Sequence, residues 1–163
     1  MLLIARKFGD LSFAKLMDVY TESCRENGRE FWSKEPPERQ LALAEQDFYD
    51  YLTRSFFPFE GAVYAIWTHG NRYVSALRLE PYRDGLLLEA LETAPDFRRR
   101  GYARDLILAV RAYFSDVKIY SHVGKRNAPS LKTHEACGFR RVLDYAVYID
   151  GSVDDRCCTM CLE

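Results

Sequence analysis

The sequence lacks the features that mark membrane, secreted and nucleic-acid-binding proteins. No apolar run approaches the roughly 18 residues of a membrane span. The first seven residues are too short for a signal peptide, and their charges follow the apolar residues instead of preceding them. The formal net charge is −1, so no overall field attracts nucleic acid or anionic lipid. We therefore expect a cytoplasmic protein that binds neither nucleic acid nor membranes.

Cysteine is scarce and irregularly spaced. The five residues are Cys24, Cys137, Cys157, Cys158 and Cys161. An odd number without regular spacing does not fit a secreted disulfide framework. The C-terminal three suggest a metal site, but no His or Cys pair with zinc-finger spacing accompanies them. Because successive strand residues point to opposite faces, we expect these three to be core residues of a terminal strand that bind no metal.

What the sequence does contain indicates one folded domain over residues 1–163. Hydrophobic residues make up 48% and charged residues 29%, which is a globular balance. A chain of this length buries roughly two-thirds of its unfolded surface without cross-links. The aromatic share of 14% suits a core with a lined cleft, and no internal repeat or low-complexity segment interrupts it.

Hydrophobic periodicity predicts strands that alternate with helices. A strand at 2–8 is followed by a helix from Ser12 to about Cys24, which Asn27-Gly28 ends. A second helix begins at Pro36-Pro37 and reaches about Ser55. The remaining elements are strands at 62–68, 73–79 and 86–93, a helix at 101–114, a strand at 117–123, a helix at 129–137 and two long final strands around Asp150-Gly151. This order predicts an α/β-type layered domain, with a mixed sheet and helices on both faces.

The most informative segment runs from Leu91 to Ala103. A buried strand ends in a turn that contains proline, and the basic run Arg98-Arg99-Arg100 then enters a helix through Gly101. A helix N-terminus offers unpaired N–H groups and a partial positive charge, and glycine lets a phosphate approach the backbone. The segment therefore reads as an anion-binding turn. A solvated basic helix start without a ligand explains the same residues.

The segment resembles the pyrophosphate loop of the GNAT superfamily of N-acetyltransferases. That loop reads Q/R-x-x-G-x-G/A, and residues 98–103 (RRRGYA) fit it. A second match follows about 30 residues later, where residues 127–139 (NAPSLKTHEACGF) resemble the family's N-x-x-A-x-x-L-Y-E-K-x-G-F. Asn127, Glu135, Gly138 and Phe139 agree with the pattern, whereas His134 replaces its tyrosine. The resemblance covers residues 86–145 well and the remainder through element order.

The resemblance implies a fold, a cosubstrate and its binding residues. The fold would be a mixed, mostly antiparallel sheet with helices on both faces, and the reaction a direct transfer of acetyl from acetyl-CoA to a primary amine. The main chain near Leu91 and Thr93 would pair with the pantetheine arm, and Asn127 would bond the pantetheine or a bridging water. The pyrophosphate would lie on the turn formed by Arg98, Arg99, Arg100, Gly101, Tyr102, Ala103 and Arg104.

The chemistry requires a base for the amine and a proton or hydrogen bond for the leaving thiolate. The resemblance puts His134 at the position that serves the leaving sulfur, and a surface histidine without a role is the alternative. His122 occupies the position of a base in some family members. Glu89, Glu92 and a water chain are competing bases.

The acceptor site is expected at the loop from Glu26 to Glu35 and at the hairpin around Asp150. Phe31 and Trp32 would wall it, and Glu26 and Glu30 would attract a cationic amine; a solvated loop is the alternative. The acceptor is a small molecule or a peptide amine such as a protein N-terminus. Its identity stays open, as do the preferred acyl chain and a homodimer, which is frequent in the family.

Two other function classes are compatible with the residues. The substitution at His134 leaves room for a catalytically degenerate module that only binds acyl-CoA. A nucleic-acid-binding domain would use the arginine run at 98–100, but the balanced net charge and the lack of an interleaved basic and aromatic surface argue against it.

Overall fold

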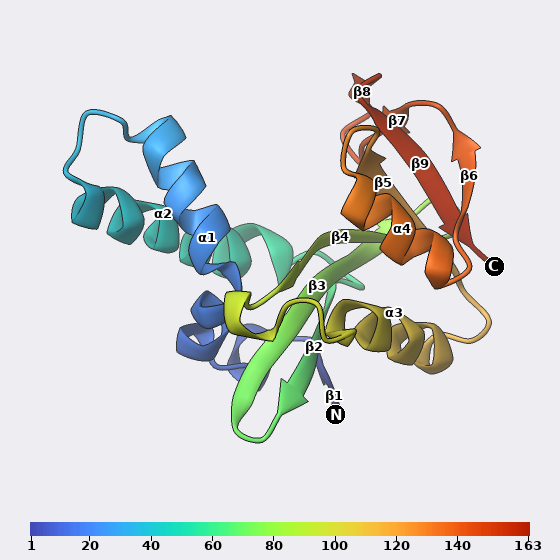
Figure 1. Ribbon diagram of the computed structural model, residues 1–163, viewed down its shortest axis with the longest axis horizontal. Coiled ribbons are helices and arrows are strands. Elements are labelled where there is room, and N and C mark those ends of the chain that lie inside the picture. The colour runs from blue at the N-terminus through green and yellow to red at the C-terminus, as the bar shows by residue number, and fades with distance from the viewer.

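A sheet divides the two pairs of helices in the computed structural model, which describes all residues from 1 to 163 (Figure 1). The helices are α1 (Phe13–Phe31), α2 (Pro37–Tyr51), α3 (Tyr102–Tyr113) and α4 (Ala128–Ala136), and a π-helical turn over Leu52–Phe56 extends α2. The strands are β1 (Leu2–Ala5), β2 (Val63–His69), β3 (Arg72–Tyr82), β4 (Gly85–Thr93), β5 (Lys118–Gly124), β6 (Arg140–Leu143), β7 (Ala146–Val147), β8 (Val153–Asp154) and β9 (Cys157–Leu162). None of the helices is long and apolar enough to cross a membrane.

The sheet is mixed but mostly antiparallel. Its order is β1-β2-β3-β4-β5-β9-β6, and only the β4–β5 pair is parallel. A separate two-stranded hairpin joins β7 and β8. Helices α1 and α2 cover one face, and α3 and α4 cover the other (Figure 1). The predicted fold class, with helices on both faces of a mixed sheet, is therefore confirmed.

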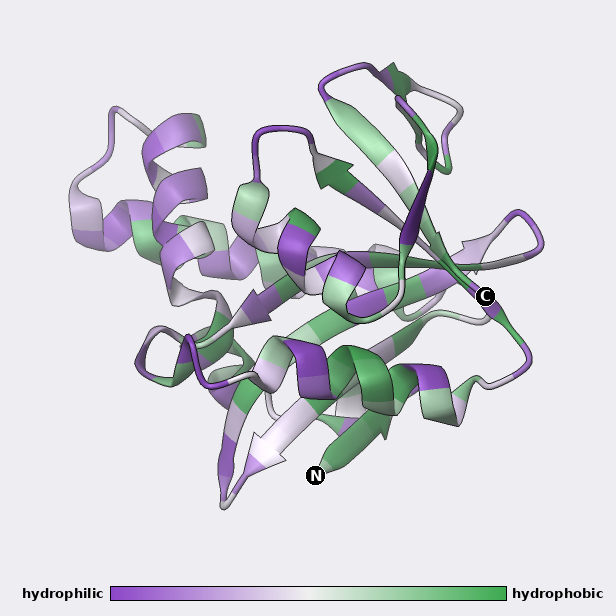
Figure 2. Cartoon of the chain, turned by 45° about the vertical axis from the view of Figure 1, so that its right-hand side comes forward, coloured by the Kyte–Doolittle hydropathy of each residue, from purple (hydrophilic) through white to green (hydrophobic).

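Strand alternation sends side chains of the same strand into two separate cores. On β2, Tyr64 and Ile66 join the core under α1 and α2, whereas Val63 and Ala65 join the core under α3 and α4. Figure 2 shows the apolar residues along the central strands and the hydrophilic ones on the loops and on the outer turns of α1 and α2. A side chain of an inner strand therefore lies either on the α1–α2 face or on the α3–α4 face of the sheet.

The first helix does not end where the sequence predicts. Gly28 lies inside α1, which continues to Phe31. A Cβ at Gly28 would meet the Gln40 carbonyl oxygen at 2.7 Å, so glycine is required because α2 packs against this turn. The glycine marks a close contact between helices, and the interpretation as a helix stop was wrong.

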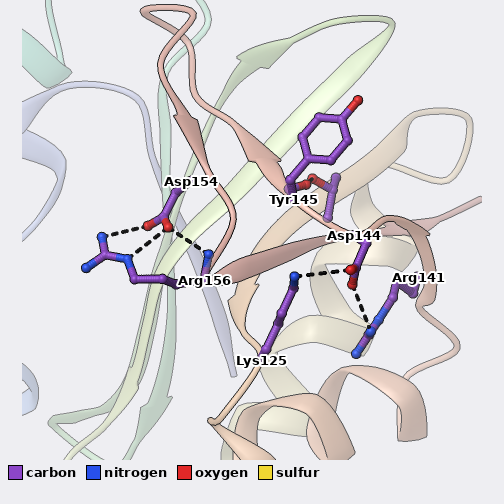
Figure 3. A network of polar contacts seen from close by, with 7 residues as sticks. Lys125, Arg141, Asp144, Tyr145, Asp154 and Arg156 are labelled. Carbon is purple, nitrogen blue, oxygen red and sulfur yellow. Dashed lines mark hydrogen bonds and ion pairs between the residues drawn. The ribbon is translucent and has the colours of Figure 1, made fainter.

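The prediction of two long final strands was also wrong. Side-chain hydrogen bonds break this region into β6, β7, β8 and β9: the Asp154 carboxylate accepts from the Arg156 backbone N–H at 2.9 Å and so turns the chain just before β9 (Figure 3). Strand β9 inserts between β5 and β6. It carries Cys157, Cys158 and Cys161, so their placement on a terminal strand is confirmed. No cluster of three or more His, Cys, Asp or Glu side chains has the arrangement of a metal site.

Strands β4 and β5 separate halfway along their length. Their parallel pairing ends at Leu88 and Ser121. Beyond it, β5 pairs only with β9, and β4 pairs with β3 through an irregularity at Ala90, whose φ is +49°. The β4 edge from Glu89 to Thr93 therefore has no strand partner on its β5 side, and its backbone groups are open to an extended ligand.

Candidate functional site

A cleft of about 380 Å³ follows the open edge of β4 to the start of α3. It brings together most of the residues predicted to bind the cosubstrate: Leu91, Thr93, Arg98, Arg99, Gly101, Tyr102, Ala103 and Arg104. Pro129, Ser130 and Thr133 of α4 form its far wall. Strand edge and helix N-terminus therefore face one elongated cleft.

The turn into α3 has the geometry of an anion-binding site. Arg99 has a φ of +58° and Gly101 a φ of +85°, so two of three successive residues have positive φ, as in left-handed backbone. Gly101 is the N-cap of α3, and no side chain accepts a hydrogen bond from the N–H groups of the first turn. A Cβ at Gly101 would meet no atom within 4 Å. These N–H groups are left for a ligand, which the positive end of the helix dipole favours when it is an anion.

Two of the predicted arginines behave differently within this turn. The Arg98 Nη2 pairs with the Glu22 carboxylate at 2.6 Å, and its Nε donates to the Thr93 carbonyl oxygen at 3.2 Å. Arg98 therefore holds the end of β4 in place as well as lining the cleft. Arg100 does not line it; its guanidinium lies 5.5 Å from the centre of the Phe97 ring.

Asn127 lies outside the main cleft, at the start of α4. Its side-chain oxygen accepts from the Ser130 N–H at 3.2 Å, which caps the helix. It lines a neighbouring depression with Lys125 and Arg156. Its amide NH₂ is not engaged within the protein, so only this end of the side chain is available to a ligand.

His134 is only 2% exposed and faces β5 rather than the cleft. Its Nδ1 lies 2.8 Å from the Ser130 carbonyl oxygen, and because a carbonyl only accepts, Nδ1 carries the hydrogen. Its Nε2 lies 3.0 Å from the Ser121 hydroxyl, which donates to it. Burial lowers the pKa of His134, so the ring is neutral at neutral pH, although the Ser130 carbonyl acts in the opposite direction. In this arrangement His134 offers no free N–H to a leaving group.

His122 lies on the opposite face of the sheet, between two tyrosine rings. The ring centres of Tyr82 and Tyr148 are 5.5 and 5.0 Å away, and both His122 nitrogens are buried without a hydrogen-bond partner. Burial lowers the pKa of His122, against the charge of Glu89. His122 lines none of the clefts described here, so the structure does not bring it together with His134.

A second pocket, of about 290 Å³, lies on the α1–α2 face of the same strand. Ala90 and Glu92 of β4 line it, together with Arg78 of β3. Half of its other lining residues are aromatic, and all ten come from α1, from α2 or from the residue that follows α1: Tyr20, Ser23, Cys24, Asn27, Phe31, Trp32, Ala44, Asp47, Phe48 and Tyr51. Phe31 and Trp32 therefore wall a pocket, but Glu26 and Glu30 do not line it.

Glu92 is the carboxylate of this pocket that lies on β4. Burial raises the pKa of its side chain, while the Ser23 hydroxyl and the charge of Arg98 lower it. The sequence named Glu92 as one of several bases, and the structure places it in the pocket walled by Phe31 and Trp32, whereas Glu89 lines another pocket. Arg78 was missed altogether, because an arginine between Leu77 and Leu79 follows the ordinary alternation of apolar and polar residues in a strand.

A third pocket, of about 410 Å³, adjoins the second across Tyr51. Glu80, Glu89 and Asp150 line it. Burial and the neighbouring Glu89 raise the pKa of Glu80 to about 7. The hairpin around Asp150 thus contributes to a cavity on the α1–α2 face, beside the pocket walled by Phe31 and Trp32.

The comparisons with known proteins identify the family and the fold. The sequence profile of the acetyltransferase (GNAT) family matches residues 15–139. No curated relative matches the sequence. A similar solved structure is the ribosomal-protein-S18-alanine N-acetyltransferase of Escherichia coli, with 17% identity, a TM-score of 0.60 and coverage of 99% of this chain and 93% of that one.

Two further solved structures are similar over nearly the whole chain. The PaiA N-acetyltransferase of Thermoplasma acidophilum, in complex with coenzyme A, has 13% identity, a TM-score of 0.62 and coverage of 100% and 99% of the two chains. A chimera of the spermidine N-acetyltransferase SpeG of Vibrio cholerae has 18% identity, a TM-score of 0.57 and coverage of 99% and 94%. These similarities establish the acyl-CoA N-acyltransferase fold that the sequence motifs predicted.

Proposed function

The chain belongs to the acetyltransferase (GNAT) family, and from this premise we propose that it transfers an acetyl group from acetyl-CoA directly to a primary amine. The amine nitrogen attacks the thioester carbonyl, the new C–N bond forms and the C–S bond breaks. Coenzyme A leaves as the thiolate and takes up a proton, while the amine loses one. The structural relatives whose names specify an alanine or spermidine acceptor, and the one that contains coenzyme A, support this reaction class.

One observation carries the proposal: a single strand lines two clefts on its two faces. Leu91 and Thr93 line the cleft that leads to the α3 N-terminus, whereas Ala90 and Glu92 line the aromatic pocket on the other face. Beyond Leu88, β4 is no longer paired with β5, so this edge of the strand is not covered by a neighbouring strand. A thioester held along the open edge and an amine held in the aromatic pocket would meet at β4, as direct transfer requires.

We propose Glu92 as the base that accepts the proton of the amine, directly or through water. Burial raises its pKa, which makes the carboxylate a stronger base than an exposed one. His122 remains the alternative, because both its nitrogens are unpaired and its lowered pKa keeps it neutral and able to accept a proton. Glu92 is favoured because it lines the aromatic pocket and His122 does not.

A second candidate function is a module that binds acyl-CoA without transferring the acyl group. The arrangement of His134 favours it, because the ring that replaces the family's tyrosine donates to Ser130 and accepts from Ser121. A role of His134 at the leaving sulfur would have to pass through the Ser121 hydroxyl. Enzyme and binding module differ in turnover rather than in affinity for the cosubstrate.

The experiment that separates them is the release of free thiol from acetyl-CoA, corrected for hydrolysis, with a panel of amines. The panel contains amino acids, their decarboxylated amines, polyamines and short peptides, and propionyl-CoA serves as a second donor. Amine-dependent thiol release supports the enzyme. Saturable acetyl-CoA binding without release by any amine supports the binding module and removes the proposed activity.

A further inference from the structure

Arg78 is the one partly buried arginine of the chain, all the others being exposed, and it forms no ion pair with a carboxylate. No ion pair engages its guanidinium, and its Nε is buried without a hydrogen-bond partner. By contrast, the exposed Arg141 and Arg156 pair with aspartates at 3.2 and 2.9 Å (Figure 3). A partly buried guanidinium normally acquires an anion, because its unpaired N–H groups cost free energy there.

A partner is available in the sequence but is not used. Glu89 stands directly opposite Arg78 in the register of β3 and β4, yet the two do not form an ion pair. Glu89 instead lies beside Glu80 in the neighbouring pocket, where it helps to raise the pKa of Glu80 to about 7. Arg78 therefore has no ion-pair partner even though a carboxylate occupies the facing position.

Aromatic rings hold the guanidinium in its place. Its central carbon lies 4.8 Å from the centre of the Tyr51 ring and 5.9 Å from that of Phe56. Stacking against aromatic faces orients a guanidinium and leaves its in-plane N–H donors open. The side chain is thus held in place and can still bind a carboxylate through bidentate hydrogen bonds.

The pocket that Arg78 lines contains the rest of a recognition site. Glu92, the proposed base, lines it from β4, and Phe31, Trp32 and Phe48 supply apolar walls. Its volume of about 290 Å³ lies at the lower end of the range of small-molecule pockets, so it suits a compact metabolite. Carboxylate, amine and apolar body are the three features that a ligand of this pocket would need.

We propose that the acceptor is a free amino acid with an apolar or aromatic side chain, whose carboxylate is bound by Arg78 while its amine faces Glu92. This inference rests on the proposed function and narrows it. A residue at a protein N-terminus carries an amide in place of this carboxylate, and a polyamine carries another cation. Both would leave Arg78 without an anion inside the pocket.

The test compares each amino acid with two matched analogues. Phenylalanine, tryptophan, leucine and methionine are assayed with acetyl-CoA beside their amides, which lose the negative charge, and their decarboxylated amines. We expect kcat/KM of at least one amino acid to exceed that of its amide and amine by about 10- to 100-fold, as the loss of charge-assisted hydrogen bonds implies. Amides or amines that react as well as every amino acid would overturn the inference while leaving the proposed function intact.

Variants at position 78 separate binding from folding. Arg78→Gln should raise KM for the preferred amino acid by about 10- to 100-fold and leave kcat/KM of its decarboxylated amine within about threefold. Arg78→Lys should restore part of the affinity for the amino acid. Arg54→Gln, at an exposed arginine outside the pocket, should leave the kinetic constants for both substrates unchanged. An equal loss for acid and amine in a folded Arg78→Gln protein would assign Arg78 to structure instead. If none of the three forms is acetylated, this inference fails, and the wider amine panel decides the proposed function separately.

Discussion

Gly101→Glu tests the anion-binding turn with a control that the chain itself provides. Gly101 and Gly151 have φ values of +85° and +84°, and a Cβ at either would meet no atom within 4 Å. A glutamate at either position therefore costs a similar amount of folding free energy, about 1–2 kcal/mol for a left-handed non-glycine residue. Only position 101 begins α3 at the cleft that we propose for the cosubstrate.

The effect on binding follows from the charge. A carboxylate about 5 Å from a phosphate, at an effective dielectric constant of about 20, repels it by roughly 3 kcal/mol. That corresponds to a loss of affinity of more than about 100-fold. We expect calorimetric titration with acetyl-CoA to give this loss for Gly101→Glu and a change of less than about threefold for Gly151→Glu, with similar melting temperatures. Equal acetyl-CoA affinity in the two folded variants would refute the assignment of the turn.

Three other substitutions test separate parts of the account. Glu92→Gln should lower kcat by about 100-fold or more and remove the rise of kcat/KM with pH through the carboxyl pKa. Because folding raises the pKa of Glu92, the ionised side chain opposes folding at neutral pH, and the variant should also melt at a higher temperature. A variant as active as the parent would assign the role of the base to His122. His134→Ala should cost about 2–4 kcal/mol, because it leaves Ser121 and the Ser130 carbonyl unpaired in a buried space. Since burial lowers the pKa of His134, the parent should lose stability as the pH falls below about 6.5, and His134→Ala should lose less. The kcat of the parent should not fall as the pH rises above about 6.5. A fall of kcat above that pH in the parent, absent from His134→Ala, would establish an imidazolium donor. Gly28→Ala should destabilise the fold by about 1–3 kcal/mol in chemical denaturation without changing acetyl-CoA affinity, and an unchanged midpoint would contradict the close packing of α1 on α2.

The cleft that we propose for the cosubstrate could be predicted from the sequence because its determinants are local. An anion-binding turn needs a strand, a glycine and a helix start in succession, and residues 91–104 contain all three within one segment. In the proposed binding mode backbone groups hold the pyrophosphate, so a departure such as His134 does not disturb the pattern. The element order followed from the same kind of local periodicity.

The aromatic pocket, which we propose for the acceptor, could not be predicted in the same way. Arg78, Glu92 and Tyr51 come from β3, β4 and α2, and only the packing of α1 and α2 on the sheet brings them around one pocket. Gly28 reads locally as a helix stop, and its role in helix packing depends on Gln40 of the next helix. The residues of a site can be named from the sequence when they lie within one continuous segment of the chain. The residues of this pocket come from separate elements, so the sequence does not show that they lie together.

The most direct test of the central claim is to follow an isotope-labelled acetyl group from acetyl-CoA by mass spectrometry in the presence of the amine panel. The account predicts one labelled, amide-linked product for each thiol released, at a rate that Gly101→Glu abolishes. If acetyl-CoA binds tightly in the cleft and the label nevertheless stays on coenzyme A or appears only as acetate with every amine, the claim of acetyl transfer to an amine is contradicted.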